Sequence, residues 1–273
     1  MKGQPVINTA DLMPLAARIP RVSVKLNGKD RLGALKVRFG IGRDNYAVTP
    51  GLYKVGNPDS RSEVLVSANY KLSFDMLRKN LESLDVWILV IDTNGVNVWC
   101  AAGKGNFGTD NVVKSIRNAS LEHIVSHRSI LLPQLSASGI AAHKVKEQTG
   151  FRPLFGPVQA KDIKAFIGAG HKATPEMRKV SFPMKERAKL VPVDFMYQKY
   201  NLLIILASVF ILSGLDRTGF LFSKMWGTSL FPILNILSAY IAGIVLAPVF
   251  LPFIPFRMFA LKGAFGDYWL PFS

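Results

Sequence analysis

The residue with the clearest chemistry is Cys100, the single cysteine in a chain of 273 residues. One thiol excludes an intrachain disulfide, a cysteine-rich zinc site and an iron–sulfur cluster held by this chain alone. As a thiolate, Cys100 can still bind one metal ion. A lone cysteine is more often a small core residue than a ligand, so its neighbours in residues 97–109 decide between these roles.

Two nucleotide-binding interpretations of this segment are weak. A phosphate loop built on Lys104 needs glycine at position 98 and Ser or Thr at position 105, where the chain has Val98 and Gly105. The spacing Gly103-x-Gly105-x-x-Gly108 does match a dinucleotide-binding fingerprint. However, about ten residues separate these glycines from the preceding strand, and no acid ends the next strand.

A third interpretation is a short helix over residues 97–104, capped by Asn97 and ended by Gly105. In such a helix Asn97, Cys100 and Lys104 share one face. The ammonium group of Lys104 would favour the thiolate, which is the form that binds metal.

The other faces of this helix are expected to pack on the domain. Trp99, Ala102 and Gly103 fall away from Cys100, and Trp99 is expected to be a packing anchor rather than a catalytic group. The open face then carries one thiolate among small residues. Such a face suits docking beneath a flat macrocycle.

Apolar runs that alternate with amphipathic stretches predict an α/β domain around this helix. Strands are predicted over residues 63–68, 86–92 and 129–132, and helices over residues 74–84, 109–118, 141–148 and 161–167. Short connections between such elements imply a Rossmann-like parallel sheet covered on both faces, with Thr109 as a candidate helix N-cap. Ligands of these sheets bind beyond the carboxyl ends of the strands, so we expect a cofactor at the connection 93–109.

The positive charge of the chain precedes its apolar region. All but four of the 34 Lys and Arg residues come before residue 201. The sequence has no zinc-finger spacing, aromatic RNA-binding signature or recognition-helix pattern, so nucleic acid is not an expected partner. A basic approach to an apolar segment is instead typical of the cytoplasmic flank of membrane helices.

The α/β domain is expected to precede a helical transmembrane segment. The expected divisions are a basic extension (1–45), the α/β domain (46–172), a basic linker with prolines (173–199) and a transmembrane region (200–273). Residues 200–222 and 231–255 are long enough to cross a hydrocarbon core of roughly 30 Å, whereas residues 257–273 are too short for a confident third crossing. The first 30 residues lack the apolar core of a signal peptide. We therefore expect an inner-membrane protein with its α/β domain in the cytoplasm.

The segment Asn97-Val98-Trp99-Cys100-Ala101-Ala102-Gly103-Lys104 resembles the cap-helix signature of HgcA, the corrinoid protein family of microbial mercury methylation. The resemblance extends through residues 67–74, 105–109, 125–128 and 156–158. It implies that Cys100 is the lower axial ligand of cobalt in a cobalamin-type corrinoid whose own base is displaced. The implied cofactor-binding residues are Ser67, Asn69, Asn97, Val98, Trp99, Cys100, Ala101, Ala102, Gly103, Lys104, Gly105, Phe107, Gly108 and Thr109.

The domain is also similar to the corrinoid half of the corrinoid iron–sulfur protein of acetyl-CoA synthesis, which lacks the cysteine ligand. That contrast makes Cys100 the discriminating residue. The Asp-x-His-x-x-Gly signature of corrinoid domains with a histidine ligand is absent from the sequence, and none of its four histidines is assigned to cobalt.

The resemblance to HgcA implies a cobalamin-dependent methyltransferase that passes a methyl group from methyl-Co(III) to inorganic Hg(II). Two other functions stay open: a membrane-anchored methyl carrier in one-carbon metabolism, and non-catalytic corrinoid binding. The implied partners are a ferredoxin-like iron–sulfur protein as reductant and candidate Hg(II) donor, a methyl-corrinoid protein or methyltetrahydrofolate as methyl donor, and the lipid bilayer. The family has about five membrane spans, so the two clear spans here suggest a shortened membrane region.

Overall fold

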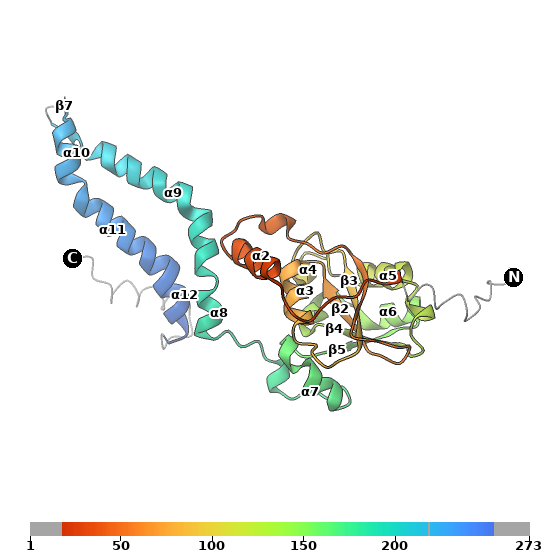
Figure 1. Ribbon diagram of the computed structural model, residues 1–273. Helices are drawn as coiled ribbons and strands as arrows, with labels where there is room; N and C mark the ends of the chain where they lie inside the picture. Colours follow the sequence, from red (N-terminus) through yellow and green to blue (C-terminus); the bar gives the residue numbers. More distant parts are fainter. Residues whose placement is uncertain (1–17, 218, 254–273) are drawn as a thin grey trace. The chain divides into compact units, whose positions relative to one another are not determined.

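The structure, a computed structural model, describes residues 18–217 and 219–253. The chain divides into two compact units (Figure 1). The α/β unit takes in residues 42–180 and the segment before residue 35, and the helical unit takes in residues 35–41 and those after residue 180. Cys100 belongs to the α/β unit.

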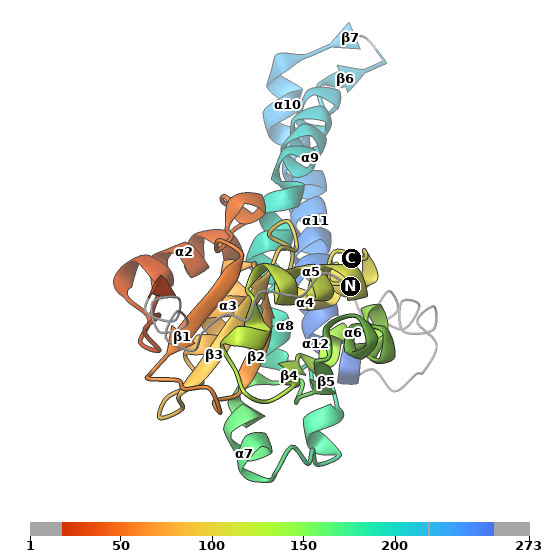
Figure 2. The same ribbon diagram turned by 90° about the vertical axis from the view of Figure 1, so that its right-hand side faces the viewer.

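The α/β unit is built on a five-stranded sheet with the strand order β1-β3-β2-β4-β5, which Figure 2 shows from left to right. The strands are β1 (Gly51–Val55), β2 (Val64–Ala68), β3 (Val86–Ile91), β4 (Ser129–Leu132) and β5 (Arg152–Phe155). Strands β2 to β5 are parallel, and β1 pairs with β3 in the antiparallel direction. The prediction of a purely parallel sheet is therefore wrong at one edge.

The two edge strands, β1 and β5, could not be predicted from their sequences. Strand β1 is only partly buried, because it is the last strand at its edge of the sheet and only an isolated parallel bridge between Arg21 and Lys54 lies beyond it. Strand β5 contains Pro153, which lacks the N–H that a central strand would have to donate. Neither strand has the continuous apolar run that revealed β2 and β3.

The helices of the α/β unit cover both faces of the sheet, as predicted. They are α3 (Lys71–Arg78), α4 (Val98–Gly103), α5 (Thr109–Asn118), α6 (Ala142–Thr149) and α7 (Ile163–Gly168). On one face Leu89 of β3 packs in a core with Val112 of α5. On the other face Ile88 packs in a second core with Phe74 of α3 and Phe166 of α7. In Figure 1 the sheet accordingly lies between α3 and the pair α5 and α6.

Most predicted elements of this unit are confirmed. Strands β2, β3 and β4 and helices α5, α6 and α7 begin and end within two residues of their predicted limits. Helix α3 begins three residues earlier than predicted and ends at Arg78 rather than at residue 84. Turns replace the last predicted turns of helix, and Ser83 adopts a left-handed conformation with φ 65°.

Part of the predicted N-terminal extension forms helix α2 (Gly28–Arg38). Its residue Asp30 is buried and accepts hydrogen bonds from Lys71 Nζ and Arg78 Nη2, each at 2.7 Å. Both partners belong to α3, so these ion pairs hold the first part of α2 against the rest of the α/β unit.

The helical unit carries two helices that are long and apolar enough to cross a membrane, judged by length and composition alone. The first covers Met184–Leu212 and includes α8 (Met184–Ala188) and α9 (Val191–Leu212). The second covers Leu230–Phe253 and begins with α11 (Leu230–Ile241). Their mean hydropathies are 1.5 and 2.1.

The first apolar helix differs in its limits from the predicted span over residues 200–222. It ends at Leu212, and the chain then forms a short hairpin of β6 (Leu215–Asp216) and β7 (Gly219–Phe220) before α10 (Phe222–Thr228). Asp216 forms an ion pair with Lys224 there, so the charge that interrupts the apolar run lies outside the helix. The end of the second predicted span and residues 257–273 lie outside the described residues.

Candidate functional site

Helix α4 lies at the carboxyl end of the parallel strands. It follows β3 and packs against the carboxyl end of β2 and against a 3-10 segment after β4, Gln134–Gly139, labelled η3. Strands β3 and β4 flank β2 on opposite sides, so the connections after β2 and β4 diverge. Such a divergence is where open α/β sheets bind their ligands. Residues 93–109, where the sequence predicts a cofactor, follow β3 at this same end of the sheet.

The short helix around Cys100 has the predicted cap. Asn97 is its N-cap, and Asn97 Oδ1 accepts a hydrogen bond from the Cys100 N–H at 3.0 Å. The same side chain donates from Nδ2 to Cys100 Sγ at 3.5 Å. Gly105 follows the helix with a φ of 82°, a conformation that glycine adopts without strain. Asn97 therefore contacts both the backbone and the thiol of Cys100.

The outward face of α4 carries the thiol. Cys100, Gly103 and the C-cap residue Lys104 are exposed, whereas Ala101 and Ala102 are buried against the core. Trp99 is also exposed, at 63 % of its surface, so the expectation that Trp99 and Gly103 pack on the domain is wrong for both residues and holds only for Ala102. A helix of six residues has an inward face only about two residues wide, and the two alanines occupy it.

Phe107 and Gly139 pack against the buried side of α4. Phe107 is fully buried, and its N–H donates to Ala101 O at 3.0 Å. Gly139, at the end of η3, lies so close that an added Cβ would be 2.7 Å from Phe107 O and 3.1 Å from Ala102 O. Sequence reasoning missed Gly139, because nothing in its local sequence shows that a distant backbone approaches it.

Asn69 fixes the loop that leads into α4. Its Oδ1 accepts hydrogen bonds from Thr93 N (3.1 Å), Thr93 Oγ1 (2.8 Å) and Gly95 N (2.9 Å), and its Nδ2 donates to Asp92 Oδ1 (3.1 Å). Only 5 % of Asn69 is exposed. The structure therefore gives Asn69 a role in positioning the loop, beside the cofactor contact that the sequence suggests.

The other predicted cofactor-binding residues lie around this loop and helix. Ser67 is buried and donates from Oγ to Ala68 O at 3.1 Å. Val98, the first residue of α4, is half-buried. Gly108, not Thr109, is the N-cap of α5, and Thr109 Oγ1 instead accepts a hydrogen bond from the Ala141 N–H at 2.9 Å.

The exposed face of α4 offers one side chain that can bind a metal, the thiol of Cys100. Among the described residues, no group of three or more His, Cys, Asp or Glu side chains could hold a metal ion. A metal inside a planar macrocycle needs only one ligand from below, and Cys100 offers one exposed thiol. A Cβ added at Gly103 or Gly105 would meet nothing within 4 Å, so these positions leave room for a flat group.

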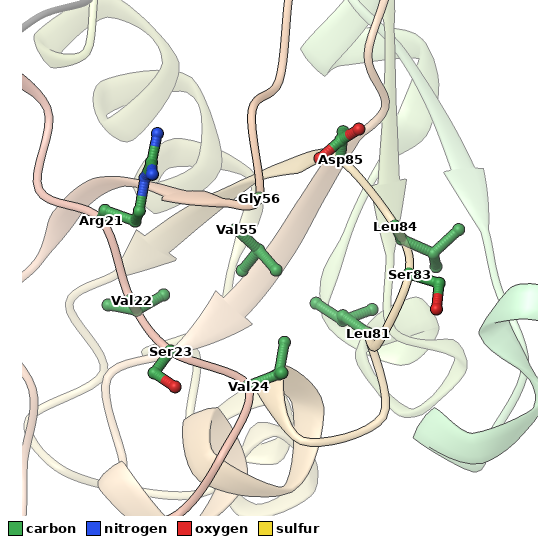
Figure 3. A pocket seen from close by; sticks show the side chains of 10 residues that line it. All are labelled: Arg21, Val22, Ser23, Val24, Val55, Gly56, Leu81, Ser83, Leu84 and Asp85. Carbon is green, nitrogen blue, oxygen red and sulfur yellow. The ribbon is translucent and has the colours of Figure 1, made fainter.

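A hollow of about 590 Å³ lies elsewhere in the α/β unit (Figure 3). Its wall includes Arg21, Val55 and Asp85. Asp85 directly precedes β3, whereas α4 follows the other end of that strand. The hollow is thus at the end of β3 opposite to Cys100, and it holds none of the predicted site residues.

Comparison with known proteins places the α/β unit in a family. The family described as "CO dehydrogenase/acetyl-CoA synthase delta subunit" matches residues 28–167, just over half of the chain. Similar proteins include the acetyl-CoA decarbonylase/synthase complex subunit gamma of Methanopyrus kandleri, 33 % identical over 127 residues, and that of Methanocaldococcus jannaschii, 34 % identical over 127 residues. Each match covers 46 % of this chain but only 27 % and 26 % of the relative. The chain belongs to the CO dehydrogenase/acetyl-CoA synthase delta subunit family.

Proposed function

We propose that the α/β unit binds a corrinoid with its own base displaced, that Cys100 is the lower ligand of its cobalt, and that the protein is a methyl carrier in one-carbon metabolism. The observation that carries the proposal is the exposed thiol of Cys100 on a short helix at the carboxyl end of the sheet. The family match and the relatives, which are subunits of acetyl-CoA decarbonylase/synthase complexes, support the one-carbon assignment.

The residues of α4 have different roles in holding such a cofactor. Ala101 and Ala102 fix the helix on the core, and Asn97 holds its first turn. Gly103 and Gly105 carry no side chain, so the corrinoid ring can come close to the outward face of α4. A bound corrinoid supplies a cobalt that accepts a methyl group from a donor and passes it to an acceptor.

The proposed carrier needs a donor and a reductant. The donor is methyltetrahydrofolate or a methyl-corrinoid protein, since either provides a methyl group that a reduced cobalt can accept. A chain with one cysteine cannot hold its own iron–sulfur cluster, so electrons for reactivation come from an iron–sulfur partner. A ferredoxin-like protein fits that need.

A second candidate acceptor is Hg(II), which would make the protein a mercury methyltransferase. The observation that favours it is Cys100 itself within Asn97–Lys104, because the resemblance to HgcA rests on that segment. The comparisons favour the one-carbon function over this one.

The two apolar helices extend the proposal to the membrane. We place Met184–Leu212 and Leu230–Phe253 across the bilayer, with the α/β unit in the cytoplasm. The exposed basic residues before the first helix, among them Lys172 and Lys179, fit the cytoplasmic side.

The acceptor can be tested by comparing two reactions of the same preparation. The full chain, loaded with corrinoid under anaerobic conditions and methylated, is given either Hg(II) or an acetyl-CoA decarbonylase/synthase preparation with CO and coenzyme A. The proposal predicts methyl transfer to acetyl-CoA that Cys100→Ala abolishes and the exposed control Lys114→Ala leaves intact. Formation of methylmercury without acetyl-CoA would establish the second candidate. If neither product formed, both candidate functions would be rejected.

A further inference from the structure

We propose that Asn97 is a positioning residue for the Cys100 thiol and weakens the sulfur as a cobalt ligand by donating a hydrogen bond to it. The inference rests on the proposed function, because it requires that Cys100 bind cobalt. Asn97 acts through Cys100 and touches neither substrate nor acceptor in this account.

The orientation of the Asn97 amide follows from its two neighbours. The backbone N–H of Cys100 can only donate, so the oxygen of the amide must face it, at 3.0 Å. That assignment leaves Nδ2 as the atom 3.5 Å from Cys100 Sγ. Because an amide nitrogen can only donate, the sulfur must be the acceptor.

The position of Asn97 is itself fixed from the buried side. The fully buried Thr93 hydroxyl lies 2.7 Å from Val96 O, one residue before Asn97, and 2.8 Å from Asn69 Oδ1, and its single proton is donated to one of these two oxygens at a time. Asn69 holds Thr93 and Gly95 from the neighbouring strand. The amide of Asn97 is therefore aimed at the thiol by a network that ends in the core.

A hydrogen bond to a ligating sulfur has a predictable effect on the metal. The donor draws electron density from the thiolate, so less reaches the metal, and the lower oxidation state becomes easier to form. In a corrinoid held by Cys100, the Asn97 amide would favour reduction of cobalt(II) to cobalt(I). Loss of the donor should make that reduction harder.

Substitution at position 97 can separate this effect from helix capping. Asn97→Asp keeps an oxygen to cap α4 but replaces the donating NH₂ group, because Asp is as good an N-cap as Asn. Asn97→Gly removes the donor without adding charge, and glycine is itself among the residues that helix N-caps tolerate well. The matched control is Gln148→Glu, which adds the same charge at an exposed position of α6.

The experiment measures the cobalt(II)/cobalt(I) midpoint potential and the cobalt–sulfur absorption of the full chain loaded with hydroxocobalamin. We expect both Asn97 variants to keep the cobalt–sulfur absorption while their midpoint potentials move to more negative values, Asn97→Asp further than Asn97→Gly. At a fixed applied potential, the cobalt(I) fraction should fall several-fold in Asn97→Asp and stay unchanged in Gln148→Glu.

The outcomes separate the inference from the proposed function. Equal midpoint potentials in the wild type, both Asn97 variants and Gln148→Glu would show that Asn97 only caps the helix, and the inference would fall alone. A wild-type protein without a cobalt–sulfur bond would remove the proposed function and the inference with it. If Asn97→Asp binds no corrinoid, the potential of Asn97→Gly decides the inference by the same criterion.

Discussion

Asn69, directly after β2, holds Thr93, which follows the neighbouring strand β3, through hydrogen bonds to its backbone N–H and its hydroxyl at 3.1 and 2.8 Å. This pair joins the carboxyl ends of two adjacent parallel strands. Because α4 begins only a few residues later, the position of the Cys100 thiol depends on a buried amide in another part of the sequence.

Replacing Asn69 by Ala should therefore damage both stability and the site. Three hydrogen bonds to Asn69 Oδ1 would be lost from a nearly dry environment, so we expect the free energy of unfolding to fall by about 2–4 kcal/mol. Urea denaturation checks this, with the exposed Asn118→Ala as the control. If Asn69→Ala and the control lowered the free energy of unfolding equally, the loop before α4 would not depend on Asn69 for its position.

Two glycines near α4 should respond to alanine in opposite ways. At Gly139 a Cβ would press on the backbone oxygens of Phe107 and Ala102, so Gly139→Ala should destabilise the α/β unit by about 1–3 kcal/mol. At Gly103 a Cβ would meet nothing, so Gly103→Ala should leave stability unchanged or slightly higher and weaken corrinoid binding.

The measurements are thermal denaturation and corrinoid titration of each variant. Gly168→Ala is the control, because Gly168 also ends a short helix and has open space around it. Unchanged stability in Gly139→Ala would contradict the close packing of η3 on α4. Unchanged corrinoid affinity in Gly103→Ala would contradict the proposed binding face.

The sequence predicted the part of this site that depends on local structure. An N-cap Asn, a following glycine and small residues between them are local signals, and the helix with its exposed thiol formed as expected from them. The strands β2 and β3 were also predictable, because burial on both faces of a sheet requires continuous apolar runs.

The remaining features depend on contacts between distant segments. Trp99 is exposed because η3 and the core leave room beneath α4 only for the two alanines, and no local pattern encodes that limit. The bonds of Asn69 and the close approach at Gly139 likewise arise only when β2, β3 and β4 meet. Strand β1 was hidden because an edge strand can be half exposed.

The ion pairs of Asp30 should make the α/β unit sensitive to strong acid. Burial by itself raises the pKa of Asp30, but hydrogen bonds from Lys71, the Asn27 N–H and Arg78 outweigh it and lower the pKa from 3.8 to about 2. A carboxyl with a lowered folded-state pKa contributes stability above its unfolded pKa and loses that contribution as the pH falls through the folded value.

We therefore expect Asp30 to contribute at most about 2 kcal/mol above pH 4, and to lose this contribution between about pH 4 and pH 2. Urea denaturation at several pH values in this window, for the wild type and Asp30→Asn, measures it. The difference between the two proteins should shrink as the pH falls. A difference that stays constant down to pH 2 would show that the charge of Asp30 is irrelevant.

The membrane proposal predicts which side each segment faces. A reporter that works only in the cytoplasm should be active when it is fused after Thr174. A reporter that works only on the other side of the membrane should be active when it is inserted between Leu212 and Phe222, because one apolar helix separates these positions. A protein without residues 184–253 should be released from the membrane fraction. Two reporters on the same side would contradict a crossing by Met184–Leu212.

Cobalt-edge X-ray absorption of the corrinoid-loaded full chain is the most direct test of the central claim, that Cys100 binds the metal. The account predicts sulfur at bonding distance in the wild type and its loss in Cys100→Ala, whose fold should persist because the helix face at Cys100 is exposed and little buried volume is removed. Circular dichroism of both proteins verifies the fold. A wild-type spectrum with only nitrogen or oxygen neighbours, or the same spectrum in wild type and Cys100→Ala, would contradict the account.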